Sequence, residues 1–142
     1  MIEFNCQRIF LDTAPFIYFL EDNEHYIVKM EEIFGQLIAD NVPLVTSTIT
    51  FEEYLVHPYR TKQAEKAQAF FDFVEDANIE VININKDIAK LAAHIRADYL
   101  SFHAMDALQL ATALKCNCDG FLTNDKRLRS FTKTKCLIVD EC

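Results

Sequence analysis

Short apolar runs separated by helix-length segments are the feature that most constrains the fold of this 142-residue chain. The runs are typical of short buried strands, and they lie at 8–11, 43–46, 81–84, 121–123 and 136–139. Helical patterns fill most of the intervals, at 15–20, 26–41, 61–76, 86 to about 100 and 101–115, with a shorter one before Pro58. Because a helical crossover makes successive strands parallel, the pattern predicts an α/β sandwich with helices on both faces. One compact domain, residues 1–142, is expected.

Capping residues predict where several helices begin and end. Thr13 is the expected N-cap of the first helix, and Pro15 suits its first turn. Ser101 is the expected N-cap of the helix at 101–115, which places Asp106 in the first turns. A carboxylate there gains about 0.3–1 kcal/mol from the helix dipole, so Asp106 has an ordinary structural explanation. Pro58 is expected to end the short helix after the second strand.

The chain is acidic, with a net charge of −8 from 22 acidic and 14 basic residues. This balance argues against a protein that covers nucleic acid with a basic face. However, five bases fall within one short stretch: Lys126, Arg127, Arg129, Lys133 and Lys135. The stretch is a candidate contact for backbone phosphates, and a solvated helix face is the alternative interpretation.

Several classes of protein are disfavoured by what the sequence contains. Its five cysteines are odd in number and none forms a Cys-x-x-Cys pair, which argues against a disulfide framework or a zinc knuckle. No apolar run has the length of a membrane span, and the first residues lack the pattern of a signal peptide. We therefore expect a protein of the reducing cytoplasm. With two glycines, the chain has no glycine-rich phosphate loop.

Acidic residues follow two of the predicted strands. Asp12 comes directly after the first strand, and Asp125 follows the fourth. In open α/β sheets, ligands bind beyond the carboxyl ends of the strands where strand order reverses, so these two carboxylates meet if their strands are neighbours. Glu53 and Asp106, on helices next to the second and fourth strands, can reach the same place. Carboxylates about 4 Å apart repel by about 4 kcal/mol per pair, so the cluster requires either that some of the acids are protonated or that a cation lies among them.

Oxygen ligands without thiolate or imidazole suit Mg²⁺ or Mn²⁺ rather than Zn²⁺. One or two such ions can activate water for hydrolysis of a phosphodiester. Each acid also has a structural explanation. Asp12 can cap a helix, and Asp125 can form an Asx turn. Glu53 can complete a capping box with Thr50, and spacing alone does not separate Glu53 from Glu52 as the acid of the site.

Four motifs together resemble the PIN domain, and in particular its VapC-like toxins. They are Leu11-Asp12-Thr13, Ser47-Thr-Ile-Thr50-Phe-Glu-Glu53, His103-Ala-Met-Asp106 and Leu122-Thr-Asn-Asp125. The resemblance spans about residues 8–131 and implies a three-layer α/β/α sandwich with a parallel five-stranded sheet in the order 3-2-1-4-5. It also implies a Mg²⁺- or Mn²⁺-dependent endoribonuclease, the toxin of a type II toxin–antitoxin pair, that forms a homodimer and is inhibited by an antitoxin. The helix at 61–76 and the acidic balance depart from the family pattern.

The resemblance assigns the catalytic role to the four acids. Asp12, Asp106 and Asp125 are the expected metal ligands, directly or through water. Glu53 is expected to position the metal or its water. A catalytically weak PIN-fold module that binds a protein partner is the alternative function, and a metal-titrated cleavage assay on RNA separates the two.

Further residues near Asp125 have supporting roles in this hypothesis. Thr123 and Asn124 are expected to hold a metal-bound water or a phosphate oxygen. Lys126, Arg127 and Arg129 are the expected contacts to the RNA backbone. The sequence does not specify which RNA is cleaved, and it does not identify an antitoxin.

Overall fold

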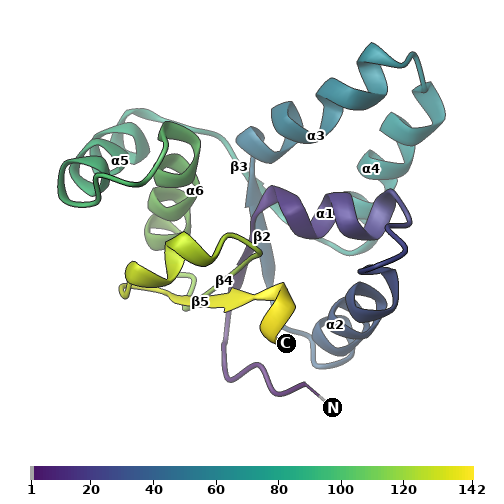
Figure 1. The fold of residues 1–142 in the computed structure, drawn as a ribbon, viewed down its shortest axis with the longest axis horizontal. Coiled ribbons are helices and arrows are strands. Elements are labelled where there is room, and N and C mark those ends of the chain that lie inside the picture. Colours follow the sequence, from purple (N-terminus) through teal and green to yellow (C-terminus); the bar gives the residue numbers. More distant parts are fainter. Residues whose placement is uncertain (1) are drawn as a thin grey trace.

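A five-stranded parallel sheet runs through the computed structural model, which describes residues 2–142 (Figure 1). The strands are β1 (Ile9–Leu11), β2 (Leu44–Ser47), β3 (Glu80–Ile82), β4 (Gly120–Thr123) and β5 (Lys135–Ile138). Their order is β3-β2-β1-β4-β5 and every pairing is parallel. This topology confirms the predicted fold, and it places β1 beside β4, where the strand order reverses.

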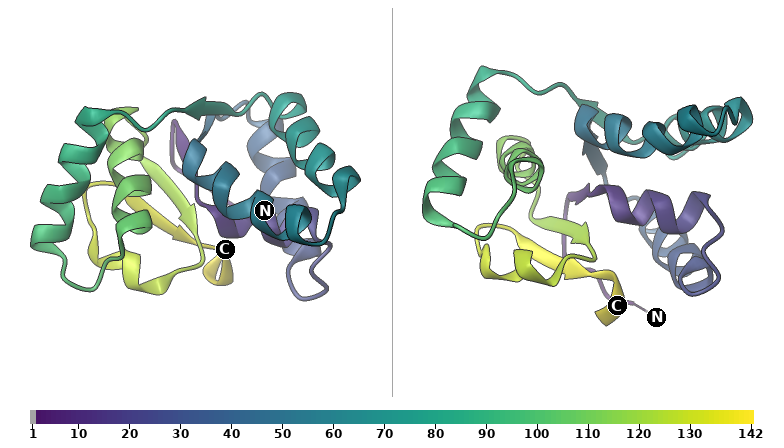
Figure 2. Two further views of the ribbon diagram at one scale, coloured as in Figure 1. Left: turned by 90° about the horizontal axis from the view of Figure 1, so that it is seen from above. Right: turned by 45° about the horizontal axis from the view of Figure 1, so that its top comes forward.

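Helices cover both faces of the sheet. They are α1 (Thr13–Leu20), α2 (Ile27–Ala39), α3 (Thr48–Arg60), α4 (Ala64–Asp76), α5 (Lys86–Asp98) and α6 (Ala104–Lys115). Figure 2 shows α5 and α6 on one side of the sheet and α1–α4 on the other. The sequence did not predict two short 3₁₀ turns, η1 (Lys126–Ser130) and η2 (Val139–Glu141). Within residues 2–142, no helix is both long enough and apolar enough to cross a membrane.

The central strand contributes to two separate cores. Ile9 and Leu11 of β1 pack on the side of α1–α4, whereas Phe10 packs on the side of α5 and α6. None of the three has exposed surface. Phe10 also stacks on Phe121 of β4, with ring centroids 5.2 Å apart. Burial of each such side chain stabilises the fold by about 1.5–3 kcal/mol, and burial on both faces explains the continuous apolar run.

Two predicted helix N-caps are wrong by one or two residues. The N-cap of α1 is Asp12, whose carboxylate accepts a hydrogen bond from the backbone N–H of Thr13 at 2.9 Å. The N-cap of α6 is His103 rather than Ser101. Asp106 is the third residue of α6 and accepts from the backbone N–H of His103 at 2.9 Å. The prediction that Asp106 lies in the first turn is therefore confirmed, with its carboxylate satisfying an otherwise free N–H.

The third helix does not end at its proline. Pro58 lies inside α3, and the helix continues to Arg60. Because Pro58 comes near the end, its missing N–H removes one hydrogen bond only, and the ring is buried. Lys62 then adopts a left-handed backbone conformation with φ of 54°, which ends the helix and turns the chain into α4. The helix predicted at 61–76 consequently begins at Ala64.

A buried chain of hydrogen bonds joins α6 to β2, α3 and the end of β1. Gln109 of α6 donates from Nε2 to Thr50 Oγ1 at 2.9 Å and accepts from Ser47 Oγ. Thr50 Oγ1 lies 2.9 Å from Thr46 Oγ1, which donates to the carbonyl of Leu11 at 2.8 Å. Thr46 has one hydroxyl hydrogen and gives it to Leu11, so Thr50 donates to Thr46. We call these side chains the Gln109 network.

Removing the Gln109 amide should destabilise the fold. In Gln109→Leu, the buried hydroxyls of Ser47 and Thr50 lose a partner, which costs roughly 1–3 kcal/mol per group. Urea unfolding should show this loss, and the melting temperature should fall by several degrees. Thr112→Val is the matched control, because buried Thr112 is also on α6 but its hydroxyl donates to Leu108 O of the same helix. A Gln109→Leu chain as stable as the wild type would contradict this role of the network.

Candidate active site

The carboxyl ends of β1 and β4 lie side by side, and the predicted acids gather there. Asp12 comes directly after β1, and Asp125 comes two residues after the last residue of β4, Thr123. The backbone N–H of Asp12 donates to the carbonyl of Leu122 at 2.9 Å, which extends the pairing of the two strands by one residue. Strand pairing itself therefore brings Asp12 next to Thr123.

The carboxylate of Asp12 is held by two hydrogen bonds. Oδ1 accepts from the N–H of Thr13 at 2.9 Å, and Oδ2 accepts from the hydroxyl of Thr123 at 2.8 Å. Burial raises the pKa of Asp12 to about 6 despite these bonds, and the negative charges of Glu53 and Asp106 act in the same direction. Within residues 2–142, Asp12 has no ion-pair partner. The arrangement therefore favours a cation near Asp12.

Glu53 reaches the same place from α3. Its Oε1 accepts from the hydroxyl of Thr13 at 2.7 Å, so Thr13 contacts both Glu53 and Asp12. In the part of the chain that the structure describes, the neighbouring Glu52 makes no side-chain hydrogen bond or ion pair of its own. The geometry thus favours Glu53 over Glu52. The sequence did not predict that Thr13 connects Asp12 with Glu53. Its position directly after Asp12 is the one local indication of this role.

The capping-box explanation of Glu53 is wrong. The N-cap of α3 is Ser47, whose hydroxyl oxygen accepts from the backbone N–H of Ile49 at 3.1 Å. Thr50 lies inside the helix, and its hydroxyl belongs to the Gln109 network. Glu53 therefore has no capping partner in Thr50, and its side-chain hydrogen bond among the described residues is with Thr13, the first residue of α1.

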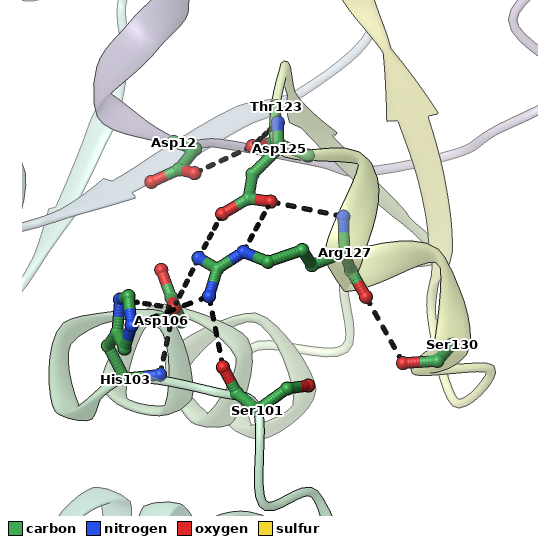
Figure 3. A network of polar contacts seen from close by, with 8 residues as sticks. All are labelled: Asp12, Ser101, His103, Asp106, Thr123, Asp125, Arg127 and Ser130. Atoms are coloured by element: carbon green, nitrogen blue, oxygen red, sulfur yellow. Dashed lines mark hydrogen bonds and ion pairs between the residues drawn. The ribbon is translucent and has the colours of Figure 1, made fainter.

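Asp106 and Asp125 are joined by the guanidinium group of Arg127 (Figure 3). Nη2 lies 3.3 Å from Asp106 Oδ2 and forms an ion pair with Asp125 Oδ2, while Nε donates to Asp125 Oδ1 at 3.0 Å. Nη1 donates to the carbonyl of Ser101 at 3.0 Å. These contacts with Arg127 hold the pKa of Asp125 below its usual range. Arg127 thus offsets one of the two negative charges of this pair of acids.

The acids form two pairs rather than one closed cluster. No three His, Cys, Asp or Glu side chains among residues 2–142 are arranged to hold a metal ion as they stand. Asp12 lies with Glu53 through Thr13, whereas Arg127 lies between Asp106 and Asp125 (Figure 3). The donors are nevertheless all carboxylate oxygens, which suit a hard cation such as Mg²⁺. The residues present therefore fit a divalent metal in chemistry.

Thr123 and Asn124 both have partners within the protein. The hydroxyl of Thr123 donates to Asp12, and its oxygen accepts from the backbone N–H of Asp125 at 3.2 Å. The amide nitrogen of Asn124 lies 3.1 Å from the hydroxyls of both Tyr18 and Tyr26. Thr123 therefore positions Asp12, while Asn124 holds an aromatic pair. Their roles toward water or phosphate remain predictions.

Each base predicted to contact RNA is paired with an acid. The pairs are Lys126–Asp140 at 3.9 Å, Arg127–Asp125, and Arg129–Glu141 at 2.9 Å. The side chains of Lys126 and Arg129 are 56% and 51% exposed, and such surface pairs contribute about 0–1 kcal/mol. These two side chains can therefore exchange their partners for a phosphate, whereas Arg127 is engaged in the site.

The raised pKa of Asp12 predicts a stability that falls as pH rises. The folded chain binds more protons than the unfolded chain between about pH 4 and pH 6, because the pKa of Asp12 is higher in the fold. Without metal, wild type should lose up to about 3 kcal/mol relative to Asp12→Asn between pH 4 and pH 7, at 1.36 kcal/mol per pKa unit. Urea unfolding in EDTA across this range measures the difference.

Asp119→Asn is a control of opposite sign. Although desolvation acts in the opposite direction, hydrogen bonds from the backbone N–H groups of Gln7 and Arg8 lower the pKa of the exposed Asp119. Its contribution to stability is therefore complete above about pH 4 and is lost as pH falls below that. Identical pH profiles for wild type and Asp12→Asn would contradict the raised pKa of Asp12.

Comparison with known proteins identifies the family. The model of the PIN domain family matches residues 9–133. A chain in the crystal structure of VapBC2 from Rickettsia felis, bound to a promoter DNA fragment, has a TM-score of 0.75 at 17% identity, covering 92% of this chain and 97% of that one. A chain of FitAcB from Neisseria gonorrhoeae has a TM-score of 0.72 at 19% identity, covering 94% and 99%.

A third similar structure is VapC20 from Mycobacterium tuberculosis, described as a sarcin-ricin loop cleaving toxin. Its TM-score is 0.67 at 17% identity, covering 87% of this chain and 95% of that one. No curated protein matches the chain. The structural similarities show a shared fold, and the family model covers most of the sequence. The chain therefore belongs to the PIN domain family.

Proposed function

We propose that the chain is a metal-dependent endoribonuclease that cleaves single-stranded RNA, and that it is the toxin of a type II toxin–antitoxin pair. The observation that carries this proposal is the gathering of four acids, from different elements, at the carboxyl ends of β1 and β4. Membership of the PIN family supports a nuclease. The description of VapC20 as a sarcin-ricin loop cleaving toxin supports RNA as the substrate.

Mg²⁺ or Mn²⁺ is the proposed cofactor. When bound, such an ion supplies Lewis-acid stabilisation of phosphoryl oxygens and activates water at neutral pH. Asp12, Asp106 and Asp125 would hold it, directly or through water. The oxygen-only donor set and the raised pKa of Asp12 support this assignment, because both favour a hard cation at the site.

The residues of the chain have distinct proposed roles around the reacting phosphate. Thr13 and Thr123 fix the direction of the Asp12 carboxylate through hydrogen bonds to its two oxygens. Glu53 is exposed and accepts one hydrogen bond, from Thr13, so it retains acceptor capacity to orient the attacking water. Lys126 contacts the RNA backbone, and its exposed ammonium group supports this role.

A protein partner and a homodimer are also proposed. Structures of VapBC2 and FitAcB, and a toxin–antitoxin complex from Klebsiella pneumoniae with a TM-score of 0.69 at 20% identity, support an antitoxin. The homodimer follows from the family resemblance.

A catalytically weak module that binds a protein partner is the second candidate. The position of Arg127 between Asp106 and Asp125 favours it, because an internal cation already compensates these two acids. RNA cleavage measured against metal concentration separates the candidates. Cleavage of a mixed single-stranded RNA pool that requires Mg²⁺ or Mn²⁺ supports the nuclease, and no cleavage at any metal concentration supports the binding module.

Substitution of Glu53 should remove the metal-dependent cleavage. Glu53→Gln keeps the size of the side chain and should slow cleavage at least tenfold, which corresponds to about 1.36 kcal/mol of barrier. Glu52→Gln is the matched control, because the neighbouring residue has the same charge and lies on the same helix. It should cleave at the wild-type rate. If Glu52→Gln is the slow variant instead, the acid of the site is Glu52.

Arg127 and the metal should compete for the same two carboxylates. Arg127→Gln leaves Asp106 and Asp125 without their cation, so Mn²⁺ should bind at least about tenfold more tightly, a gain of about 1.4 kcal/mol. Calorimetric titration measures this affinity directly. Arg129→Gln is the control, because Arg129 is paired with Glu141 outside the site, and its affinity should be unchanged. Weaker Mn²⁺ binding by Arg127→Gln would mean that Arg127 orients the ligands instead of competing.

A further inference from the structure

A pocket of about 550 Å³ opens beside the acids and has a tyrosine in its wall. It extends from Asp12 and Asp125 to Tyr18 on α1. Ala14 and Tyr18 both line it, and because they are four residues apart they share one face of the helix. The small side chain of Ala14 leaves room between the carboxylate of Asp12 and the ring of Tyr18. Asp12 and Asp125 lie at one end of this pocket, and the proposed nuclease mechanism gives no role to the end at Tyr18.

The ring of Tyr18 is held in a fixed orientation. It stacks on Tyr26, with ring centroids 4.0 Å apart and an interplanar angle of 11°. Asn124 Nδ2 lies 3.1 Å from both hydroxyls, and the hydroxyl of Tyr26 donates to Asp140 Oδ1 at 2.8 Å. The backbone N–H of Asp140 donates to Asn124 Oδ1 at 3.0 Å, so both the nitrogen and the oxygen of that amide have partners. A ring fixed in this way loses little conformational entropy when a ligand stacks on it.

The two ends of the pocket match the two parts of a nucleotide. Carboxylates at one end suit a metal and the phosphodiester, and an aromatic ring at the other suits a base. Lys126, which also lines the pocket, supplies a positive charge for a phosphate of the same ligand. Ala14 and Tyr18 are separated by about 6 Å along the helix axis, so the ring lies within reach of a base next to the reacting phosphate. Aromatic rings bind bases of any sequence by stacking, provided that the base is unpaired.

We propose that Tyr18 forms a stacking subsite for one unpaired nucleobase, next to the phosphodiester that lies at Asp12 and Asp125. This inference rests on the proposed function, because it assigns a substrate contact to the same site. The alternative role of the partly buried Tyr18–Tyr26 pair is structural, namely to join α1 to the start of α2. The two roles differ in whether binding depends on a base at one position of the ligand.

The test is a double-mutant cycle between Tyr18 and the bases of a single-stranded heptathymidylate. Fluorescence anisotropy at low salt, with Mg²⁺, measures binding of the labelled oligomer and of versions with an abasic site at each position. In the wild type, one abasic position should weaken binding about tenfold. Tyr18→Leu should bind the intact oligomer about tenfold more weakly and be insensitive to the abasic site at that position. Tyr18→Phe keeps the ring and should stay within about twofold of the wild type.

Tyr59→Leu is the matched control, because Tyr59 is a tyrosine of α3, 60% exposed, that does not line this pocket. It should bind like the wild type. If Tyr18→Leu weakens binding of every oligomer by the same factor, intact and abasic alike, the aromatic pair serves only the fold and the inference is overturned. If Tyr18→Leu does not fold, Tyr18→Trp provides a second measurement. The chain has no tryptophan, so the new indole is the sole reporter of its kind.

Fluorescence of Tyr18→Trp should be quenched by the intact oligomer and not by the version that lacks the critical base. Equal quenching by both oligomers would also overturn the subsite. Failure of the proposed function gives a different result. Base-dependent binding through Tyr18 without RNA cleavage would retain the subsite and refute the nuclease, whereas metal-dependent cleavage indifferent to Tyr18→Leu would refute the subsite alone.

Discussion

The buried hydrogen bonds of the Gln109 network hold together the elements that carry the acids. Gln109 belongs to α6, its partner Thr50 to α3, and Thr46 to β2, and the chain of bonds ends on the carbonyl of Leu11 at the end of β1. Any shift of α6 away from the sheet would leave several of these groups buried without partners, at roughly 1–3 kcal/mol each. Because α6, α3 and β1 carry or precede three of the four acids, the same bonds that stabilise the fold fix the distances within the site.

Neighbouring side chains compensate the negative charges of the four acids unevenly. Arg127 joins Asp106 and Asp125, and the pKa of Asp125 falls as a result. Asp12 and Glu53 share only the neutral hydrogen-bond donor Thr13. Burial and the neighbouring negative charges therefore raise the pKa of Asp12 to about 6. Among the described residues, the half of the site next to the central strand has no side-chain cation, so the proposed metal would relieve more repulsion at Asp12 than at Asp125.

The sequence predicted the sheet well because short, fully buried strands between helices leave few alternative topologies. Helix ends were less predictable, since the choice between Thr13 and Asp12 as N-cap depends on where the neighbouring strand ends. The choice between Glu52 and Glu53 also depended on a contact across 40 residues, from Thr13 to Glu53. Gln109 gave no signal at all, because a single amide in an alanine-rich helix looks like a surface residue until its partners on other elements are known. Sequence spacing indicates which residues of one element lie on the same face. The N-cap of α1, the contact of Glu53 and the partners of Gln109 depend instead on how different elements pack together.

One short segment at the end of β4, residues 123–125, contributes to both ends of the pocket. Thr123 contacts Asp12 from the end of β4, Asn124 binds the hydroxyls of Tyr18 and Tyr26, and Asp125 pairs with Arg127. The strand ends at Thr123 and the chain bends at Asn124, so the three side chains reach different walls of the site. This explains why Asn124 is committed to the aromatic pair while the residues on either side serve the acids. A change in the backbone of this segment would consequently disturb the acids and the aromatic wall together.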